Sequence, residues 1–325
     1  MHLPLTALEG EPRLTGWRDS VGAPVALRAR PPGGTHAGMP ALILVCWNMW
    51  IGRGNLEPVL ARARAGARAS AHRAPIVVLL QEAYRAGDAV PAPSGRGVGA
   101  VDFSRRAFPE HDIVTTARRL GLNLVYAPSM RNGTHRSDRG SAILSSLPLE
   151  HAAAWELPYC YQRRVAVAAT VRIGERRLRV ASAHLDPRGG SARDLLGVLG
   201  RGAQASELVR GLLDGAGEVP IVLGADLNLS RGRREPAWQA LARAGFTHGV
   251  PAREPAWRHT FHRAPRLLLD WVLVRDPVGA LARVDVHRLD EHPADRGPYV
   301  FGSDHHPLVA RIEAAPALVA AEAAG

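Results

Sequence analysis

A carboxylate and two imidazoles stand together near the end of the chain, in the run Ser303-Asp304-His305-His306. Pro307 follows, and then an apolar run that is typical of a strand. Such a run offers an acid or base, a metal ligand and a rigid mount within a short space. The same pattern is common in solvated turns, so it predicts chemistry only if further polar residues converge on it.

Further polar side chains occur where other apolar runs end: Asn48, Glu82, His184, Asp226 and Asn228. In α/β proteins, ligands bind where strands end along one edge of a sheet. Side chains two positions apart share a face in an extended segment, so Asp226 and Asn228 should face the same way. For the same reason, His184 and Asp186 should share a face.

Each of these residues also has a purely structural interpretation. Asp226 and Asn228 could form an Asx-type turn. Glu82 could be a solvated strand end, and His184 a hydrogen-bonded surface imidazole. Taken one by one, the residues leave both interpretations open.

Apolar runs with turn signals between them predict the elements that carry these side chains. We expect strands at 24–27, 41–48, 76–80, 122–126, 141–145, 164–171, 178–183, 219–223, 267–274 and 308–312. We expect helices starting at Asn55, near 110–120, over 193–214 and around 236–244. The helix over 193–214 should carry an apolar stripe that includes Leu195, Leu196 and Leu199.

The composition is that of a globular protein, with 46% hydrophobic and 22% charged residues among 325. We expect residues 1–38 to be a poorly ordered N-terminal extension, 39–313 to be the folded domain and 314–325 to be an Ala-rich tail. No apolar run approaches the roughly 18 residues that a membrane span needs, and no export signal is recognisable. We therefore expect a cytoplasmic protein with no integral membrane association, and assume a monomer.

All 41 basic residues are arginine, and the formal net charge is +11. The absence of lysine is typical of GC-rich coding, so the charge is only mild evidence for a phosphate-rich ligand. The absence of lysine also excludes a P-loop, a kinase-type catalytic lysine and Schiff-base chemistry, because all three need the lysine amine. The two cysteines are too few for a disulfide scaffold or a cysteine zinc site.

A set of short motifs extends from about Ala41 to Ile312: Trp47-Asn48, Leu80-Gln81-Glu82, Gly140-Ser141-Ala142-Ile143-Leu144-Ser145, His184-Leu185-Asp186, Gly224-Ala225-Asp226-Leu227-Asn228, Leu269-Asp270-Trp271 and Gly302-Ser303-Asp304-His305. In this order and spacing they resemble the endonuclease/exonuclease/phosphatase superfamily of DNase I-like metal-dependent phosphoesterases. The resemblance implies a four-layered α/β sandwich, with two mixed β-sheets packed face to face and flanked by helices. It also implies hydrolysis of phosphate esters with Mg²⁺ or Mn²⁺.

The resemblance further implies catalytic roles. Asp226 would orient or deprotonate the attacking water, and Asn228 would hold that water or a phosphoryl oxygen. His184 would donate to the phosphate. His305 would be a general acid or base, or a phosphoryl-oxygen donor, oriented by the Asp270 carboxylate.

For the metal, the resemblance implies that Glu82 and Asn48 supply oxygen ligands with Asp304 close by. Adjacent residues entering a strand face opposite sides, so only one of His305 and His306 can reach the cleft. The family spacing selects His305, and His306 should be a packing residue.

The substrate class is less specific in the sequence. A phosphodiesterase or nuclease acting on nucleic acid is favoured, and a lipid-directed phosphodiesterase or phosphatase, of the sphingomyelinase or phosphoinositide phosphatase kind, is the alternative. A non-catalytic phosphate binder would be expected to have lost Glu82, Asp226 or His305. Arginines that could line the cleft for a polyanion are Arg85, Arg96, Arg105, Arg106, Arg131, Arg136 and Arg139.

Overall fold

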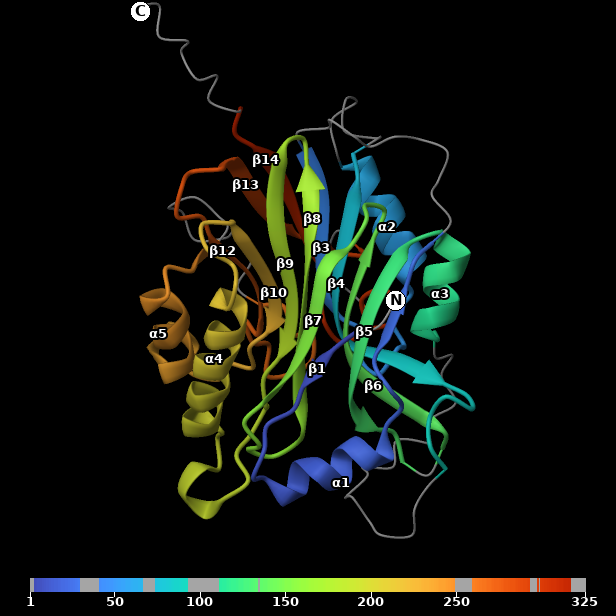
Figure 1. The fold of residues 1–325 in the computed structure, drawn as a ribbon, viewed down its shortest axis with the longest axis vertical. Helices are drawn as coiled ribbons and strands as arrows, with labels where there is room; N and C mark the ends of the chain where they lie inside the picture. Colours follow the sequence, from blue (N-terminus) through green and yellow to red (C-terminus); the bar gives the residue numbers. More distant parts are fainter. Residues whose placement is uncertain are drawn as a thin grey trace, which may run out of the picture.

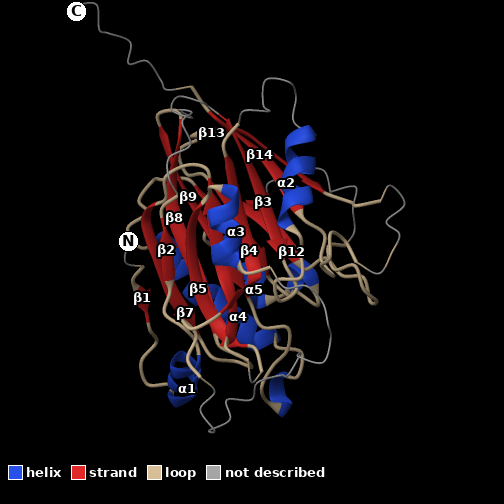
Figure 2. Ribbon diagram, turned by 90° about the vertical axis from the view of Figure 1, so that its right-hand side faces the viewer, coloured by secondary structure: helices blue, strands red, loops and turns tan. Residues whose placement is uncertain are grey.

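The computed structural model describes residues 3–29, 41–66, 74–92, 111–133, 135–248, 259–292, 297 and 299–316. Within them, two seven-stranded mixed β-sheets pack face to face, and helices cover both outer faces (Figure 1 and Figure 2). The expected four-layered α/β sandwich is therefore confirmed.

The first sheet has the strand order β1-β7-β8-β9-β10-β12-β11. The strand bounds are Leu5–Thr6 for β1, Glu150–Leu157 for β7, Arg164–Ile173 for β8, Arg176–His184 for β9, Ile221–Asp226 for β10, Thr247–His248 for β11 and Asp270–Arg275 for β12. Strand β10 runs parallel to β9 and antiparallel to β12. Helices α4 (Val198–Leu213) and α5 (Pro236–Arg243) cover the outer face of this sheet, on the left of Figure 1.

The second sheet has the strand order β13-β14-β3-β4-β6-β5-β2. The strand bounds are Val25–Leu27 for β2, Ala41–Asn48 for β3, Ile76–Ala86 for β4, Asn123–Arg131 for β5, Ser137–Ser145 for β6, Leu281–Arg288 for β13 and Leu308–Ala314 for β14. Helices α2 (Leu56–Ala65) and α3 (Ile113–Leu120) cover its outer face, and α1 (Pro12–Ser20) lies at one end of the sandwich (Figure 1).

Strand β3 shows why the sequences of the central strands are continuous apolar runs. Its even-numbered residues Leu42 and Leu44 pack in the core between the two sheets. Its odd-numbered residues Ile43 and Val45 pack in the layer that contains α2 and α3. Because both faces are covered, every position needs an apolar side chain, and the period-two pattern disappears.

Part of the predicted N-terminal extension belongs to the sandwich. Strand β1 pairs with β7 in the first sheet, and β2 pairs with β5 in the second. Leu14 and Trp17 of α1 are buried, and this removal of apolar surface from water accounts for the order. The expectation of poor order is therefore wrong for this part of the extension. Residues 30–40 and 317–325 lie outside the described residues, and the domain limits 39–313 stay a prediction.

The helix predicted over 193–214 begins later, at Val198. Gly197 just before it has a φ of +71°, and a Cβ there would lie 2.6 Å from the backbone of Arg188. Leu195 and Leu199 were expected in the apolar stripe of this helix. They are 70% and 64% exposed, so that expectation is wrong for these two residues. None of the helices that the structure describes is long and apolar enough to cross a membrane.

Candidate active site

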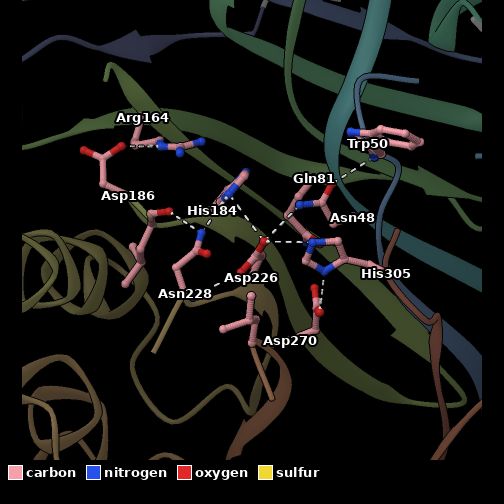
Figure 3. Close-up of polar contacts among 12 residues, drawn as sticks. Asn48, Trp50, Gln81, Arg164, His184, Asp186, Asp226, Asn228, Asp270 and His305 are labelled. Atoms are coloured by element: carbon pink, nitrogen blue, oxygen red, sulfur yellow. Dashed lines mark hydrogen bonds and ion pairs between the residues drawn. The ribbon is translucent and has the colours of Figure 1, made fainter. Parts of the chain in front are cut away.

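Strand pairing brings three of the predicted site residues to one edge of the first sheet. Asp226, the last residue of β10, is paired in register with His184 at the end of β9. On its other side it is paired with Asp270 at the start of β12. The three side chains therefore emerge side by side (Figure 3), although they come from distant parts of the sequence.

Asn48 joins this group from the facing sheet. Its Nδ2 donates to Oδ2 of Asp226 at 2.9 Å, and its Oδ1 accepts the backbone N–H of Trp50 at 3.0 Å (Figure 3). Burial of the Asp226 carboxyl, followed by the negative charge of Asp270, raises the pKa of Asp226 from 3.8 to about 7. A carboxyl with a pKa near neutrality can take and release a proton under physiological conditions.

Asn228 is held beside His184 by a left-handed backbone conformation, with φ of 51°. Its backbone N–H donates to Oδ1 of Asp226 at 3.1 Å, which is the Asx-type contact that the sequence left open. Its side-chain amide donates to Nε2 of His184 at 3.1 Å and to the Leu185 carbonyl at 2.9 Å. The structural and the functional interpretations of Asp226 and Asn228 are thus compatible.

His184 is buried and uncharged at neutral pH. Burial, with the nearby charges of Arg164, His305 and Arg139, holds the pKa of His184 well below its usual range. Because Nε2 accepts from the Asn228 amide, the neutral ring carries its proton on Nδ1. The same Nε2 lies 3.4 Å from Oδ2 of Asp226, so this nitrogen is the one that faces the site.

His305 forms a buried pair with Asp270, in which Nδ1 lies 2.7 Å from the carboxylate (Figure 3). Burial lowers the pKa of His305, but the adjacent Asp270 carboxylate outweighs burial and the pKa rises to about 10. Nε2 lies 3.9 Å from the Asp226 carboxylate and 4.0 Å from the Asp304 carboxylate. His305 is therefore an imidazolium whose second N–H faces the other site residues.

Ser303 fixes the segment that carries His305, and the sequence did not single it out as a site residue. Its Oγ accepts the His305 backbone N–H at 3.1 Å and donates to the Asn48 carbonyl at 2.7 Å. The indole N–H of Trp47 donates to the His305 carbonyl at 2.8 Å. The only sequence signal for Ser303 was its place in the Gly302–His305 motif.

Glu82 and Asp304 supply carboxylates at the Asn48 side of the site. Glu82 sits at a bulge of β4 with φ of 51°, and such bulges re-aim a side chain next to a site. Burial, with the negative charge of Glu82, raises the pKa of Asp304. Carboxylate and amide oxygens are the donors that Mg²⁺ and Mn²⁺ prefer, and a cation would relieve the repulsion between the two carboxylates. The donor set thus fits a hard divalent cation.

We expected Asp186 to share a face with His184, and this expectation is wrong. Its Oδ1 accepts from Arg164 Nε at 2.8 Å and its Oδ2 accepts from Gln204 Nε2 at 3.0 Å, away from Asp226 (Figure 3). The reason is that β9 ends at His184, so the period of two stops there.

Most of the arginines proposed to line the cleft have other contacts. Arg85 is buried against Asp138, and Arg131 donates to backbone carbonyls of Ser20 and Pro91. Arg139 donates to Oδ1 of Asn132, and it also acts on the site. Burial lowers the pKa of Arg139 while Glu82 opposes this, and the Arg139 charge lowers the pKa of His184. Arg136 pairs with Asp88 at the surface. Arg96, Arg105 and Arg106 lie outside the described residues.

Comparison with known proteins agrees with this architecture. The sequence profile described as "Endonuclease/Exonuclease/phosphatase family" matches residues 45–305. No curated protein sequence matches the chain. Among solved structures, the human Nocturnin catalytic domain with bound sulfate anion is 17% identical, with a TM-score of 0.55, and the match covers 94% of this chain and 99% of that one.

Two bacterial structures give similar values. The endonuclease/exonuclease/phosphatase from Beutenbergia cavernae is 20% identical with a TM-score of 0.57, covering 86% of this chain and 73% of that one. The endonuclease/exonuclease/phosphatase from Bacteroides vulgatus is 15% identical with a TM-score of 0.55, covering 85% and 99%. These likenesses confirm the fold, and the profile match confirms the resemblance drawn from the motifs.

Proposed function

Because the chain belongs to the endonuclease/exonuclease/phosphatase family, whose members are hydrolases acting on phosphoester bonds, we propose that it is a Mg²⁺- or Mn²⁺-dependent phosphodiesterase acting on nucleic acid. The observation that carries this proposal is the buried His305–Asp270 pair, which faces Asp226 across 3.9 Å. A protonated imidazole and a carboxylate with raised pKa form an acid and base couple at one place.

In this proposal Asp226 is the base. Asn48 and the Asn228 backbone hold its two oxygens in place. Water that is hydrogen-bonded to this carboxylate would be oriented and would lose its proton to it. The pKa of Asp226, raised to about 7 by burial and Asp270, suits proton removal at neutral pH.

The two histidines supply hydrogen bonds to the phosphate. Positive charge on His305, maintained by Asp270, would stabilise a phosphoryl oxygen, and its Nε2–H can protonate a leaving oxygen. His184, held neutral, would contribute a hydrogen bond to the phosphate, and the Asn228 amide fixes its ring. Donors that are fixed in advance cost little reorganisation during the reaction.

A divalent cation would be held by Glu82, Asn48 and Asp304. When bound, Mg²⁺ or Mn²⁺ neutralises phosphoryl charge and polarises the phosphoryl oxygen. Arg139, buried near Glu82 and His184, adds fixed positive charge on the same side.

Nucleic acid is favoured by an aromatic and cationic surface next to the metal-ligand candidates. The ring of Trp50 lies 5.0 Å from that of Tyr299, and the guanidinium groups of Arg53 and Arg263 lie 4.2 and 5.4 Å from the centre of the Trp50 ring. Arg53 is buried, whereas Arg263 is exposed and could meet a phosphate. Arg263 Nη1 also lies 3.7 Å from Asp304. Aromatic faces that stack on bases, combined with arginines that meet phosphates, are typical of surfaces that bind single-stranded nucleic acid.

A lipid phosphodiester is the second candidate. The segment after β9 exposes Leu195, Leu196 and Leu199, with exposed fractions of 70%, 50% and 64%. Leu195 also lines a cavity of about 690 Å³ with Arg188 and Tyr161. Exposed leucines beside arginine can insert into the interface of a membrane and bind its phosphates.

An activity panel distinguishes these candidates. Purified protein with Mg²⁺ or Mn²⁺ is offered DNA, RNA, bis-p-nitrophenyl phosphate and phosphodiester lipids in vesicles. We expect hydrolysis of a nucleic acid, and its loss in Asp226→Asn and on addition of a chelator. Faster hydrolysis of the lipid would select the second candidate. No hydrolysis of any of these substrates, with the cation bound, would refute catalysis.

A further inference from the structure

Three histidines lie together on the other side of the segment that carries His305. They are His259, His262 and His306, and one ring nitrogen of each lies within 4.8 Å of the others. His262 and His306 are buried, and His259 is half-buried. His306 faces away from Asp226 because it is adjacent to His305, so the phosphoesterase roles proposed above use none of the three.

Backbone carbonyls determine which nitrogens carry protons in two of these rings. Nε2 of His262 lies 2.7 Å from the Gly297 carbonyl, and Nδ1 of His306 lies 3.2 Å from the Leu289 carbonyl. A carbonyl only accepts, so both nitrogens are N–H donors. In the neutral rings, Nδ1 of His262 and Nε2 of His306 then carry lone pairs.

These two lone pairs face each other. Nδ1 of His262 and Nε2 of His306 are 3.1 Å apart. Two lone pairs at this distance repel unless a cation or a shared proton lies against both. The third imidazole, His259, is close enough to add a third nitrogen ligand. The guanidinium Nη1 of Arg288 lies 3.3 Å from its Nε2 and 3.4 Å from its Nδ1, so a cation would have to displace Arg288 from this ring.

The spacing and the surroundings suit a metal. Ligands of a tetrahedral zinc site with Zn–N bonds of about 2.0–2.1 Å are about 3.3 Å apart, close to the separation of the facing nitrogens of His262 and His306. Histidine ligands normally donate their other N–H to a carbonyl or carboxylate. His262 and His306 do so, and an Asp290 carboxylate oxygen lies 2.9 Å from His306 Nδ1. That carboxylate also pairs with Arg288, the neighbouring cation, at 2.9 Å.

We propose that His259, His262 and His306 form a second metal site that binds Zn²⁺, with water as the fourth ligand. Three neutral imidazoles select a borderline transition metal, whereas the oxygen donors around Glu82 select a hard cation. The two sites are therefore chemically separate.

The zinc site would stabilise the backbone that carries Asp270, Asp304 and His305. The backbone N–H of His262 donates to the Asp304 carbonyl at 2.7 Å, and the backbone N–H of His306 donates to the Thr260 carbonyl at 2.8 Å. Thr260 Oγ1 in turn accepts the Asp270 N–H at 2.9 Å. A metal that joins residues 259, 262 and 306 thus ties together the backbone on which Asp270, Asp304 and His305 are mounted.

Zinc retention tests the proposal directly. Full-length protein without a histidine tag is saturated with Mg²⁺, incubated with Zn²⁺ and desalted, and the zinc per chain is measured by mass spectrometry. We expect one tightly held Zn²⁺ in the wild type and loss of it in His259→Ala and His306→Ala. His135→Ala, an exposed histidine outside the cluster, and Glu82→Gln should retain it.

Cobalt provides a second readout, independent of catalysis. Co²⁺ bound to the wild type should give the visible absorption of a four-coordinate site, and His259→Ala should lack it. If His306→Ala does not fold, as judged by circular dichroism, the half-buried His259 carries the test. The proposal is overturned if the wild type retains no zinc, which would indicate a shared proton, if His259→Ala retains zinc like the wild type, or if Glu82→Gln loses it.

Discussion

Nδ1 of His305 lies 2.7 Å from Oδ2 of Asp270, although the two residues are 35 positions apart. This contact fixes the imidazole so that Nε2 faces Asp226 and Asp304. Through its charge, Asp270 raises the pKa of both His305 and Asp226. One buried carboxylate therefore sets the protonation states of the proposed acid and of the proposed base.

The pH dependence of hydrolysis should show two limbs. As a base, Asp226 must be ionised, so kcat/KM should rise with pH through about 7. As a donor, His305 must be protonated, so kcat/KM should fall above about 10. Rates measured from acid to alkaline pH at saturating metal check this. A profile that falls through pH 7 would contradict the assignment of Asp226 as base.

Asp270→Asn should move both limbs to lower pH and lower the rate. Without the negative charge of Asp270, Asp226 ionises more easily and His305 loses its proton more easily. We expect kcat to fall by about 100-fold or more, the range typical of general acid and base groups. The pH profile of the variant is the measurement. If neither limb of the pH profile shifts in the variant, Asp270 acts only through packing.

Asp226→Asn should abolish activity and remove a pH-dependent cost to the stability of the metal-free protein. The rise of the Asp226 pKa from 3.8 to about 7 corresponds to about 4 kcal/mol of stability. At a pH below the pKa of Asp226 in the unfolded chain, the carboxyl is protonated in the folded and the unfolded state, so its burial costs no stability by this effect. Above about 7 it is ionised in both states, and the full cost applies.

The amide loses one of the two acceptors that Asn48 and the Asn228 backbone use, and this loss is the same at both pH values. The unfolding free energy of the variant minus that of the wild type should therefore be more positive at about pH 8 than at about pH 5. Urea unfolding in chelator at the two pH values measures this. A difference between variant and wild type that is the same at both pH values would show that burial of Asp226 carries no such cost.

Glu82→Gln should weaken the response to metal. A neutral amide keeps the shape of the side chain and removes a charge that attracts a divalent cation. We expect the Mg²⁺ concentration for half-maximal activity to rise by about tenfold or more, as one to two kcal/mol of charge interaction would give. Titration of activity with Mg²⁺ tests this. Glu57→Gln, at an exposed position of α2, is the matched control and should not shift the titration.

Gly224→Ala should disturb the core directly behind Asp226. A Cβ at Gly224 would lie 2.8 Å from Leu79 Cδ1 and 2.9 Å from Cys46 Sγ, across the interface between the two sheets. Overpacking of this kind costs about 1–3 kcal/mol. Gly66→Ala, where φ is −73° and the nearest atom is 3.6 Å away, should be close to neutral. Thermal unfolding of both variants compares them, and equal stability would contradict the argument.

Much of the fold could be predicted because its signals are local. Apolar runs marked the main buried strands, and Asn55 marked the start of α2, where its side chain accepts the Glu57 N–H. Strands β7 and β13 were not expected, since neither has a long apolar run. The start of α4 was misplaced because the conformation of Gly197 depends on how the loop that contains Arg188 folds back against it, and no periodic pattern signals this.

The sequence by itself determined which residue types stand at the ends of the strands, and hence the family and the reaction class. Only the tertiary structure decided which of them meet. Strand register placed His184 and Asp270 on either side of Asp226, and the end of β9 turned Asp186 away towards Arg164. Burial then raised the pKa of Asp226, and contact with Asp270 raised the pKa of His305. Packing of loop 259–262 against residue 306 assembled three histidines. Register, burial and long-range contacts depend on residues far apart in the chain, so no local pattern encodes them.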